Sequence, residues 1–394
     1  GHITVQNAVI YNSLNSLTLL AEGDLYIGNH IINRGTGHVN LVAGWDPSVT
    51  SLSDLFGVAP GSPGSATVSA APDMGSLIFG TAGSFGKNGG SVYVGLTGHP
   101  GSDPSLVAAD RAVSVASRNG QTNVAGYDVN VWGPALTGAP SVGAQRYAQI
   151  GYNRRAAGTV VTDPDPVLGS IRVKAVNDVS VVANKHEVGI LGYNPAGWTA
   201  GTTDTGNASF AQIGHGGERD SVRGMKLSGE ILVEAGNDVI LLGGKTINNH
   251  AQIGHGGFDN AVANYSATLG GDITVNAGRD VTVTGGQGYY SHAQIGHGAV
   301  QQLLASFVES KIDVDAGRNV TVQGGAGTVG TENSRFSRAQ IGHGAYVSDF
   351  VDAGGAVLAP GSGKGFRGAI DVDAGGAILI QAGNYDSDNF ALIG

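Results

Sequence analysis

Four histidines occupy the same place in a repeated motif, and their type and spacing could support chemistry. Each directly follows an Ile-Gly pair, and Tyr152 takes this place in an earlier copy: His215, His255, His297 and His343. If the copies stack in register, the imidazoles lie about 5 Å apart along one corner. Rings at that spacing could share a soft metal ion or respond to pH. We favour a plainer interpretation, a corner residue that hydrogen-bonds to the next loop, because no carboxylate accompanies the histidines at a fixed offset.

A second row of identical residues lies just before these histidines. Its members all belong to Ala-Gln-Ile-Gly motifs: Gln149, Gln212, Gln252, Gln294 and Gln340. Amides stacked at strand spacing can hydrogen-bond along the column. Such a row fixes the register, which a simple alternation of Val and Thr leaves partly open. We therefore predict a structural role for the glutamines, with their side chains on the outward face.

Acidic residues recur in two further places. Asp238, Asp280 and Asn319 precede the second of two alternating runs, where we predict turn caps rather than catalytic groups. Two further segments, beginning at Ile312 and Ile370, alternate apolar residues with outward-facing carboxylates: Asp313, Asp315, Asp371 and Asp373. If these two runs are neighbours, like charges face each other, which is mildly destabilising. A weakly bound Ca²⁺ would relieve that repulsion, although the Gly-Gly-x-Gly-x-Asp pattern of β-roll calcium sites does not occur.

Enzyme motifs fail on inspection. A polysaccharide lyase or hydrolase needs carboxylates, or carboxylates and arginines, that converge on one face. The residues of this sequence that come nearest to such a set are Arg154, Arg155, Asp163, Asp165 and Asp178. Residues 325–330 match a dinucleotide-binding glycine pattern, but no helical pattern follows them. Residues 244–246 resemble the end of a phosphate loop, but Val239 stands where the first glycine is required. We therefore predict no enzymatic activity and no catalytic, cofactor-binding or metal-binding residues.

The elements that would position these rows follow from the repeats. A second motif consists of two short runs of alternating apolar and polar residues with a turn between them. Its clearest copy spans 273–286, and related copies begin at Ile171, Ile231, Ile312 and Ile370. Alternation with a period of two indicates strands, and Gly and Asx residues between the runs favour turns. Together with Ala-Gln-Ile-Gly, each unit supplies three short strands. Three short strands repeated many times predict an all-β parallel β-helix, in which stacking creates the core.

The length of the units predicts how the chain is organised. We expect a single β-helix segment of a larger protein over 1–394, with about eight coils, regular units over 171–394 and irregular coils with long loops over 44–146. The first coil is predicted to use 17–21, 24–27 and 30–33. Within 44–146, strand-like runs at 77–79, 92–94, 113–115 and 129–131 cannot be assigned to coils from the sequence. The one possible helix is 300–308, inside a loop.

Composition excludes several classes of protein. The chain has 394 residues, of which 67 are Gly and none is Cys, and a formal net charge of −10. The absence of Cys excludes disulfide scaffolds and thiolate metal sites. The negative charge argues against nucleic acid and anionic membranes as partners. No apolar run is long enough to span a bilayer, so we predict no membrane insertion.

The repeats resemble those of filamentous-haemagglutinin-type exoproteins. The resemblance lies in Ser-Leu-Thr-Leu-Leu-Ala at 16–21, Gly-His-Val-Asn-Leu-Val-Ala-Gly at 37–44, and the units at 251–257 and 271–281. It implies a right-handed β-helix and two-partner secretion of the parent protein through an outer-membrane pore. It also implies an extracellular place on the cell surface of a Gram-negative-type bacterium. The long loops depart from the compact repeats of that family.

The functional prediction is a structural and adhesive segment of a secreted surface protein. We expect contacts with surface glycans or proteins on loops at 48–73, 195–209 and 300–310, with Trp198, Tyr289 and Tyr290 as candidates for stacking on glycans. Two alternatives remain open. One is a β-helical polysaccharide lyase or hydrolase, and the other is a subunit that associates end to end into an extracellular filament.

Overall fold

The computed structural model describes most of the repeated part of the chain. The described residues are 1–46, 86, 89–95, 112–133, 146–153, 165–183, 209–217, 225–244, 249–256, 267–288, 291–298, 305–307, 309–325, 337–344, 368–383 and 389–394.

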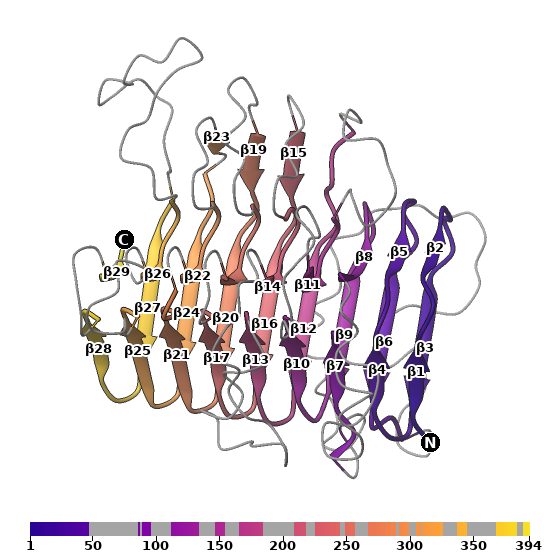
Figure 1. Cartoon of the computed structure of the whole chain (residues 1–394), viewed down its shortest axis with the longest axis horizontal. Coiled ribbons are helices and arrows are strands. Elements are labelled where there is room, and N and C mark those ends of the chain that lie inside the picture. The colour runs from indigo at the N-terminus through magenta and orange to yellow at the C-terminus, as the bar shows by residue number, and fades with distance from the viewer. Residues whose placement is uncertain are drawn as a thin grey trace.

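Three long parallel sheets run along the molecule (Figure 1). The first sheet contains β3 (Leu17–Ala21), β6 (Val39–Ala43), β9 (Thr122–Gly126), β12 (Ile171–Ala175), β16 (Ile231–Ala235), β20 (Ile273–Ala277), β24 (Ile312–Ala316) and β27 (Ile370–Ala374). The second sheet contains β1 (Ile3–Val5), β4 (Leu25–Ile27), β7 (Val92–Val94), β10 (Val129–Trp132), β13 (Val179–Val182), β17 (Val239–Leu242), β21 (Asp280–Thr284), β25 (Asn319–Gln323) and β28 (Ile378–Gln381). The third sheet contains β2 (Val9–Tyr11), β5 (Ile31–Asn33), β8 (Val113–Ser117), β11 (Arg146–Ile150), β14 (Ser209–Ile213), β18 (Ala251–Ile253), β22 (Ala293–Ile295), β26 (Ala339–Ile341) and β29 (Ala391–Ile393).

The chain visits the three sheets in turn and so forms a right-handed parallel β-helix. One strand from each sheet makes a coil. The described strands form eight complete coils, numbered here from coil 1 (β3, β4, β5) to coil 8 (β27, β28, β29). Strands β1 and β2 precede coil 1. The predicted fold and the predicted number of coils are confirmed. The strands of coil 1 lie where the sequence places them, although β4 and β5 each begin one residue later.

The core lies inside the coils, where alternating side chains point inward. The clearest column is the isoleucine of the Ala-Gln-Ile-Gly motif, since Ile253, Ile295 and Ile341 are register partners on β18, β22 and β26 and are fully buried. Burial of a Val, Leu or Ile side chain stabilises a fold by about 1.5–3 kcal/mol. Because no single coil can enclose its own inner face, this stabilisation arises from stacking.

Glycines at the corners allow the coils to approach each other closely. Gly254 follows β18 with φ near +151°, a conformation that favours glycine, and a Cβ placed there would lie 2.0 Å from the carbonyl oxygen of Gly296 in the next coil. Gly214 has the same relation to Gly254, with a separation of 1.8 Å. The invariant glycine of the motif is therefore a requirement of coil spacing.

The structure assigns the described strands of the region 44–146 to coils. Strands β7, β8 and β10 contain the runs at 92–94, 113–115 and 129–131, and β9 completes coil 3. The run at 77–79 lies outside the described residues. Coil 2 receives its long insertion after its first strand, since β6 ends at Ala43 and β7 begins at Val92.

A short fourth sheet was not predicted. It contains β15 (Met225–Ser228), β19 (Ala267–Gly270) and β23 (Ala305–Phe307), beside the corner that leads back to the first sheet (Figure 1). The possible helix at 300–308 is therefore wrong for 305–307, which form a parallel strand with β19. Strands of three or four residues are too short to display a clear alternation of apolar and polar residues. Unlike the equally short Ala-Gln-Ile strands, these three share no repeated motif, which explains why the sequence did not reveal them.

Candidate functional site

One column of polar residues connects every coil at the corner before the second sheet; we call it the corner ladder. In each coil, one side chain accepts a hydrogen bond from the backbone N–H at the same position in the next coil. The accepting residues are His2, Asp24, Ser91, Asp128, Asp178, Asp238, Asp280 and Asn319. The eight donor–acceptor distances are 2.9–3.2 Å, and the last donor is the N–H of Ala377.

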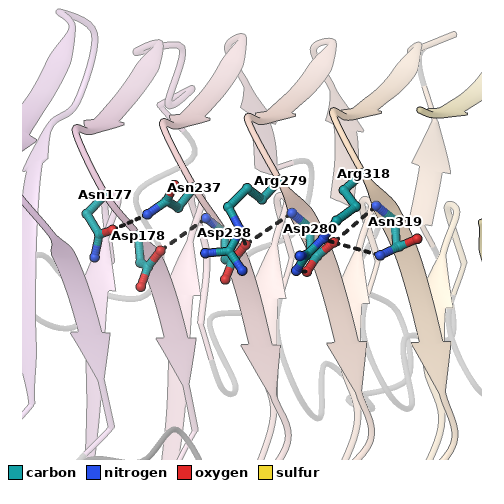
Figure 2. A network of polar contacts seen from close by, with 8 residues as sticks. All are labelled: Asn177, Asp178, Asn237, Asp238, Arg279, Asp280, Arg318 and Asn319. Atoms are coloured by element: carbon teal, nitrogen blue, oxygen red, sulfur yellow. Dashed lines mark hydrogen bonds and ion pairs between the residues drawn. The ribbon is translucent and has the colours of Figure 1, made fainter. Parts of the chain in front are cut away.

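The corner ladder explains the recurring Asx residues. Figure 2 shows the part from Asn177 to Asn319, in which one carboxylate oxygen of Asp178, Asp238 and Asp280 points along the column toward the next coil. Asp238 and Asp280 were predicted as turn caps, and they do bind a turn N–H, but the N–H belongs to the following coil. Asp, Asn, Ser and neutral His all supply such an acceptor, so the residue type can vary while the bond persists.

Charges along the corner ladder are partly neutralised by arginine. Arg318 binds both carboxylate oxygens of Asp280, with Nε 2.8 Å from Oδ1, and this hydrogen bonding lowers the pKa of Asp280 to about 2. Asp178 has the opposite environment. Burial raises its pKa, and the neighbouring carboxylates of Asp238 and Asp128 act in the same direction. These carboxylates bind backbone N–H groups, so their geometry serves coil stacking rather than acid–base catalysis.

The four histidines of the Ile-Gly-His motif form a stack that we call the histidine column. Adjacent rings have centroids 4.9–5.0 Å apart and planes within 14° of parallel. Each Nδ1 lies 3.0–3.1 Å from a backbone N of the preceding coil. Each Nε2 lies 2.5–3.0 Å from a carbonyl oxygen, and the carbonyls belong to Gly169, Gly229, Gly271 and Ser310.

This geometry fixes the tautomer of the histidine column. A backbone N–H can only donate, so Nδ1 must accept and the ring proton must be on Nε2, from which it is donated to the carbonyl. Burial lowers the pKa of His215 to about 4 and that of His297 to about 3, and it holds the pKa of His255 well below 6.5. Both ring nitrogens are engaged by the backbone, so the arrangement does not support the metal-sharing alternative.

The glutamine column is buried beneath the corner that carries the histidines. Nε2 of Gln149 donates to Oε1 of Gln212 at 3.1 Å and to the carbonyls of Gly214 and Gly216 at 2.7 Å. Gln212 and Gln252 repeat the contacts with the two glycine carbonyls of the coils that follow them. The outward orientation was predicted, but the nearly complete burial was not.

Four carboxylates do gather on the first sheet, as the sequence suggested; we call them the acidic quartet. Asp313 pairs in register with Asp371, and Asp315 pairs with Asp373, on β24 and β27. The ammonium group of Lys311 lies 2.8 Å from Asp313 and 4.0 Å from Asp371. Burial raises the pKa of Asp315, with a further contribution from Asp313, Asp373 and Asp371. A lysine therefore supplies part of the countercharge that a bound Ca²⁺ would otherwise supply.

The residues considered for polysaccharide cleavage are not brought together where the structure describes them. Asp165 lies beside the corner that precedes β12 and binds Arg118 at 3.2 Å. Asp178 lies beyond the other end of β12, and the five residues of that strand span about 17 Å. Asp163, Arg154 and Arg155 lie outside the described residues, as do Lys245, Thr246, 326–330, Trp198, Tyr289 and Tyr290. The predicted loop 48–73 is also outside them, as is 195–208.

Two aromatic columns were missed by sequence reasoning. Tyr26 stacks on Tyr93 with centroids 5.4 Å apart, and Trp132 meets Tyr93 edge-on at 6.0 Å. A separate stack joins Tyr147, Phe210, His250 and His292 at 4.7–5.0 Å. In the second column the available signal was position, because each residue directly precedes an Ala-Gln-Ile segment. The first column offered less, since Trp132 lies two residues beyond Asn130, the register partner of Tyr93. Both columns contribute to packing between coils.

Comparison with known proteins adds no family assignment. A scan against protein-family models, a search of curated proteins and a search of solved structures each found no match. In the part of the chain that the structure describes, no helix is long and apolar enough to cross a membrane. The same part contains no cluster of three or more His, Cys, Asp or Glu side chains placed to bind a metal ion.

Proposed function

We propose that this chain is a structural and adhesive segment of a secreted bacterial surface exoprotein, in which the β-helix is a rigid shaft that carries loops for contact with surfaces or glycans. The observation that carries the proposal is the corner ladder, which joins all eight coils and the preceding strands with side-chain bonds to backbone. The recurring polar residues of the described coils are engaged in stacking. That use suits a load-bearing shaft and leaves contacts with partners to the connecting segments.

The connecting segments differ from the coils in a way that suits adhesion. The coils repeat their residues closely, whereas the segments after β14, β18, β22 and β26 differ in length and composition. Binding residues concentrate on variable loops held by a rigid scaffold. All four of these segments leave the same corner, since each follows a strand of the third sheet and leads to a strand of the first.

The adhesive part of the proposal can be tested by loop exchange. The full chain is applied to immobilised host-surface glycans and matrix proteins. It is compared with a variant in which residues 345–367 are replaced by the chain's own shorter connection 299–309, which joins the register-equivalent positions in the preceding coil. We expect binding by the full chain and at least a tenfold loss in the variant, with an unchanged circular dichroism spectrum. Failure of the full chain to bind any glycan, matrix protein or cell surface would contradict an adhesive role.

Non-catalytic function is a separate part of the proposal. It rests on the engagement of Asp178 in the corner ladder and of Asp165 with Arg118. Acidic and neutral polysaccharides incubated with the purified chain should remain uncleaved. Turnover that is abolished by Asp178→Asn would replace this proposal with that of a polysaccharide lyase or hydrolase.

Secretion and surface location also belong to the proposal. The resemblance of the repeats to two-partner-secretion exoproteins supports export of the parent protein through an outer-membrane pore, and the lack of Cys is compatible with threading an unfolded chain. Protease treatment of intact source cells should remove the segment from the cell surface. Its full protection until the cells are lysed would contradict this location.

End-to-end association is a second candidate, supported by one feature of coil 8. Ile378, Leu379 and Ile380 on β28 are 47–50% exposed, and a second copy placing β1 beside β28 would bring Ile3 and Val5 against this strand. Strand edges are templates for such additions. Electron microscopy of the purified chain tests this candidate: filaments one β-helix wide support it, and dispersed rods at all concentrations oppose it.

A further inference from the structure

The histidine column has a property that a shaft does not require: it is built from neutral rings that connect backbone to backbone. Each ring accepts a hydrogen bond from a backbone N–H at Nδ1 and donates one to a backbone carbonyl from Nε2. Asn319 shows that a permanently neutral side chain can perform the accepting half of this task, since its Oδ1 accepts the N–H of Ala377 at 3.1 Å. Histidine differs because its acceptor nitrogen can itself be protonated between pH 5 and 7.

We propose that the histidine column is an acid-sensitive seam, which joins coils 3 to 7 at neutral pH and releases them when the rings bind protons. A proton on Nδ1 would face a backbone N–H and would remove the acceptor of that bond. It would also place positive charges on rings whose centroids are 4.9–5.0 Å apart. A buried ring therefore binds its proton only when the corner opens.

The charged groups and the burial along the seam differ between its two ends, and this difference determines which end opens first. Glu230, Asp272 and Lys311 directly follow Gly229, Gly271 and Ser310, whose carbonyls accept from the rings. At the coil 7 end, His343 is less buried than the other three rings, and the charge of Asp272 favours its protonation.

The coil 3 end has the opposite character. Arg118 lies 6.0 Å over the ring of Tyr152, the first donor residue of the column, and is itself paired with Asp165. His215, whose Nδ1 accepts from the N–H of Tyr152, is fully buried, so its ring is not accessible to solvent while the corner is closed. We therefore infer that the seam opens from His343 toward His215.

The size of the effect follows from proton linkage. The pKa of an unfolded histidine is about 6.5, and the folded values for this column are lower, so the opened state binds more protons below pH 6.5. Stability is fully present above that pH and is lost as the pH falls toward the folded values. For each pH unit of acidification in this window, one ring raises the ratio of open to closed molecules about tenfold. Four rings together raise that ratio up to about 10⁴-fold per pH unit.

The test uses the full chain and its His255→Asn variant, in which Oδ1 can replace Nδ1 as the acceptor. Urea unfolding is measured at several pH values between 7.5 and 5. The slope of the logarithm of the unfolding constant against pH gives the number of protons taken up on unfolding. We expect the variant to take up about one proton fewer. The matched control is His2→Asn, because His2 makes the same contact with a backbone N–H at 2.9 Å but has a side chain that is 62% exposed. The loss of proton uptake should be larger in His255→Asn than in this control, because His255 is fully buried.

A second measurement needs no variant, so it decides the matter even if His255→Asn does not fold. Chains labelled with ¹⁵N-histidine are examined by NMR at neutral pH and during acidification. We expect four rings with unprotonated Nδ1 and protonated Nε2 that keep this form well below pH 6.5 until the fold opens. Rings of the column that titrate near pH 6.5 in the folded protein, or an unchanged proton uptake in a folded His255→Asn variant, would overturn the proposal.

Discussion

At the scale of single residues, the polar groups of this β-helix act mainly as acceptors for backbone N–H groups of neighbouring coils. Strand ladders satisfy the backbone within the sheets, but corner residues need other partners because an unpaired buried N–H costs about 1–3 kcal/mol. Asp, Asn, Ser and His fill this role at successive positions of the corner ladder. The same requirement explains why carboxylates that could suggest catalysis are fixed in structural contacts.

Asp238 provides the most direct test at this scale. Its Oδ1 accepts the N–H of Asp280 at 3.1 Å, so Asp238→Ala leaves that donor without its acceptor. We expect a loss of about 1–3 kcal/mol in the free energy of unfolding, measured by urea denaturation. Asp238→Asn is the matched control and should be close to the parent, because Asn319 performs the same role. Equal stability of the alanine variant and the parent would show that the bond contributes nothing.

The acidic quartet supports a prediction of opposite sign. Asp315 faces Asp373 across the strands and has Asp313 beside it, so Asp315→Asn removes repulsion. We expect a gain of about 0.2–1 kcal/mol in the free energy of unfolding at low salt, which disappears in high salt. Asp313→Asn is the control, since Asp313 binds Lys311 at 2.8 Å and its removal should give no gain. A gain that is independent of salt would contradict an electrostatic origin.

At the scale of elements, the corners determine how closely two coils can approach. Gly254→Ala would place a Cβ 2.0 Å from the carbonyl oxygen of Gly296, and a backbone carbonyl in a stacked coil cannot move aside cheaply. We expect a loss above about 3 kcal/mol, measured as a lowered urea midpoint. Gly89→Ala is the control for backbone strain alone, because Gly89 has φ near +76° with nothing within 4 Å of the added Cβ, and should cost about 1–2 kcal/mol. Similar losses for both variants would remove coil approach as the cause.

The strands also show how far the sequence could predict the elements. Alternation over five residues in Ile-Thr-Val-Asn-Ala at β20 is sufficient to define a strand, and its repetition defines the sheet. The same reasoning could not find the fourth sheet, because β23 has three residues and depends on pairing with β19. It could not assign the strands of coils 2 and 3 either, because the long connection from Ala43 to Val92 interrupts the regular spacing between strands.

At the scale of the whole molecule, stacking of the coils aligns residues that are far apart in the sequence into columns along the axis. The histidine and glutamine rows were visible as repeats, and their alignment along the axis follows once the coils are in register. The burial of the glutamines and the neutral tautomer of the histidines were not visible, because both depend on how the Gly-His-Gly corner folds over the third sheet. Sequence patterns thus predicted the histidine and glutamine columns but not the aromatic ones, and only three-dimensional contacts reveal what each column does.

The central claim is that successive units stack in register as coils, and disulfide mapping tests it most directly because the chain contains no Cys. Thr282 on β21 and Thr321 on β25 are register partners, so their Cα atoms should be about 4.8 Å apart, within the range a disulfide spans. Gln323 is two residues further along β25, about 8 Å from Thr282 and beyond that range. Under mild oxidation, the Thr282→Cys/Thr321→Cys variant should crosslink nearly completely and the Thr282→Cys/Gln323→Cys variant only slightly. Equal crosslinking of the two variants, or none in the first, would contradict the stacked β-helix.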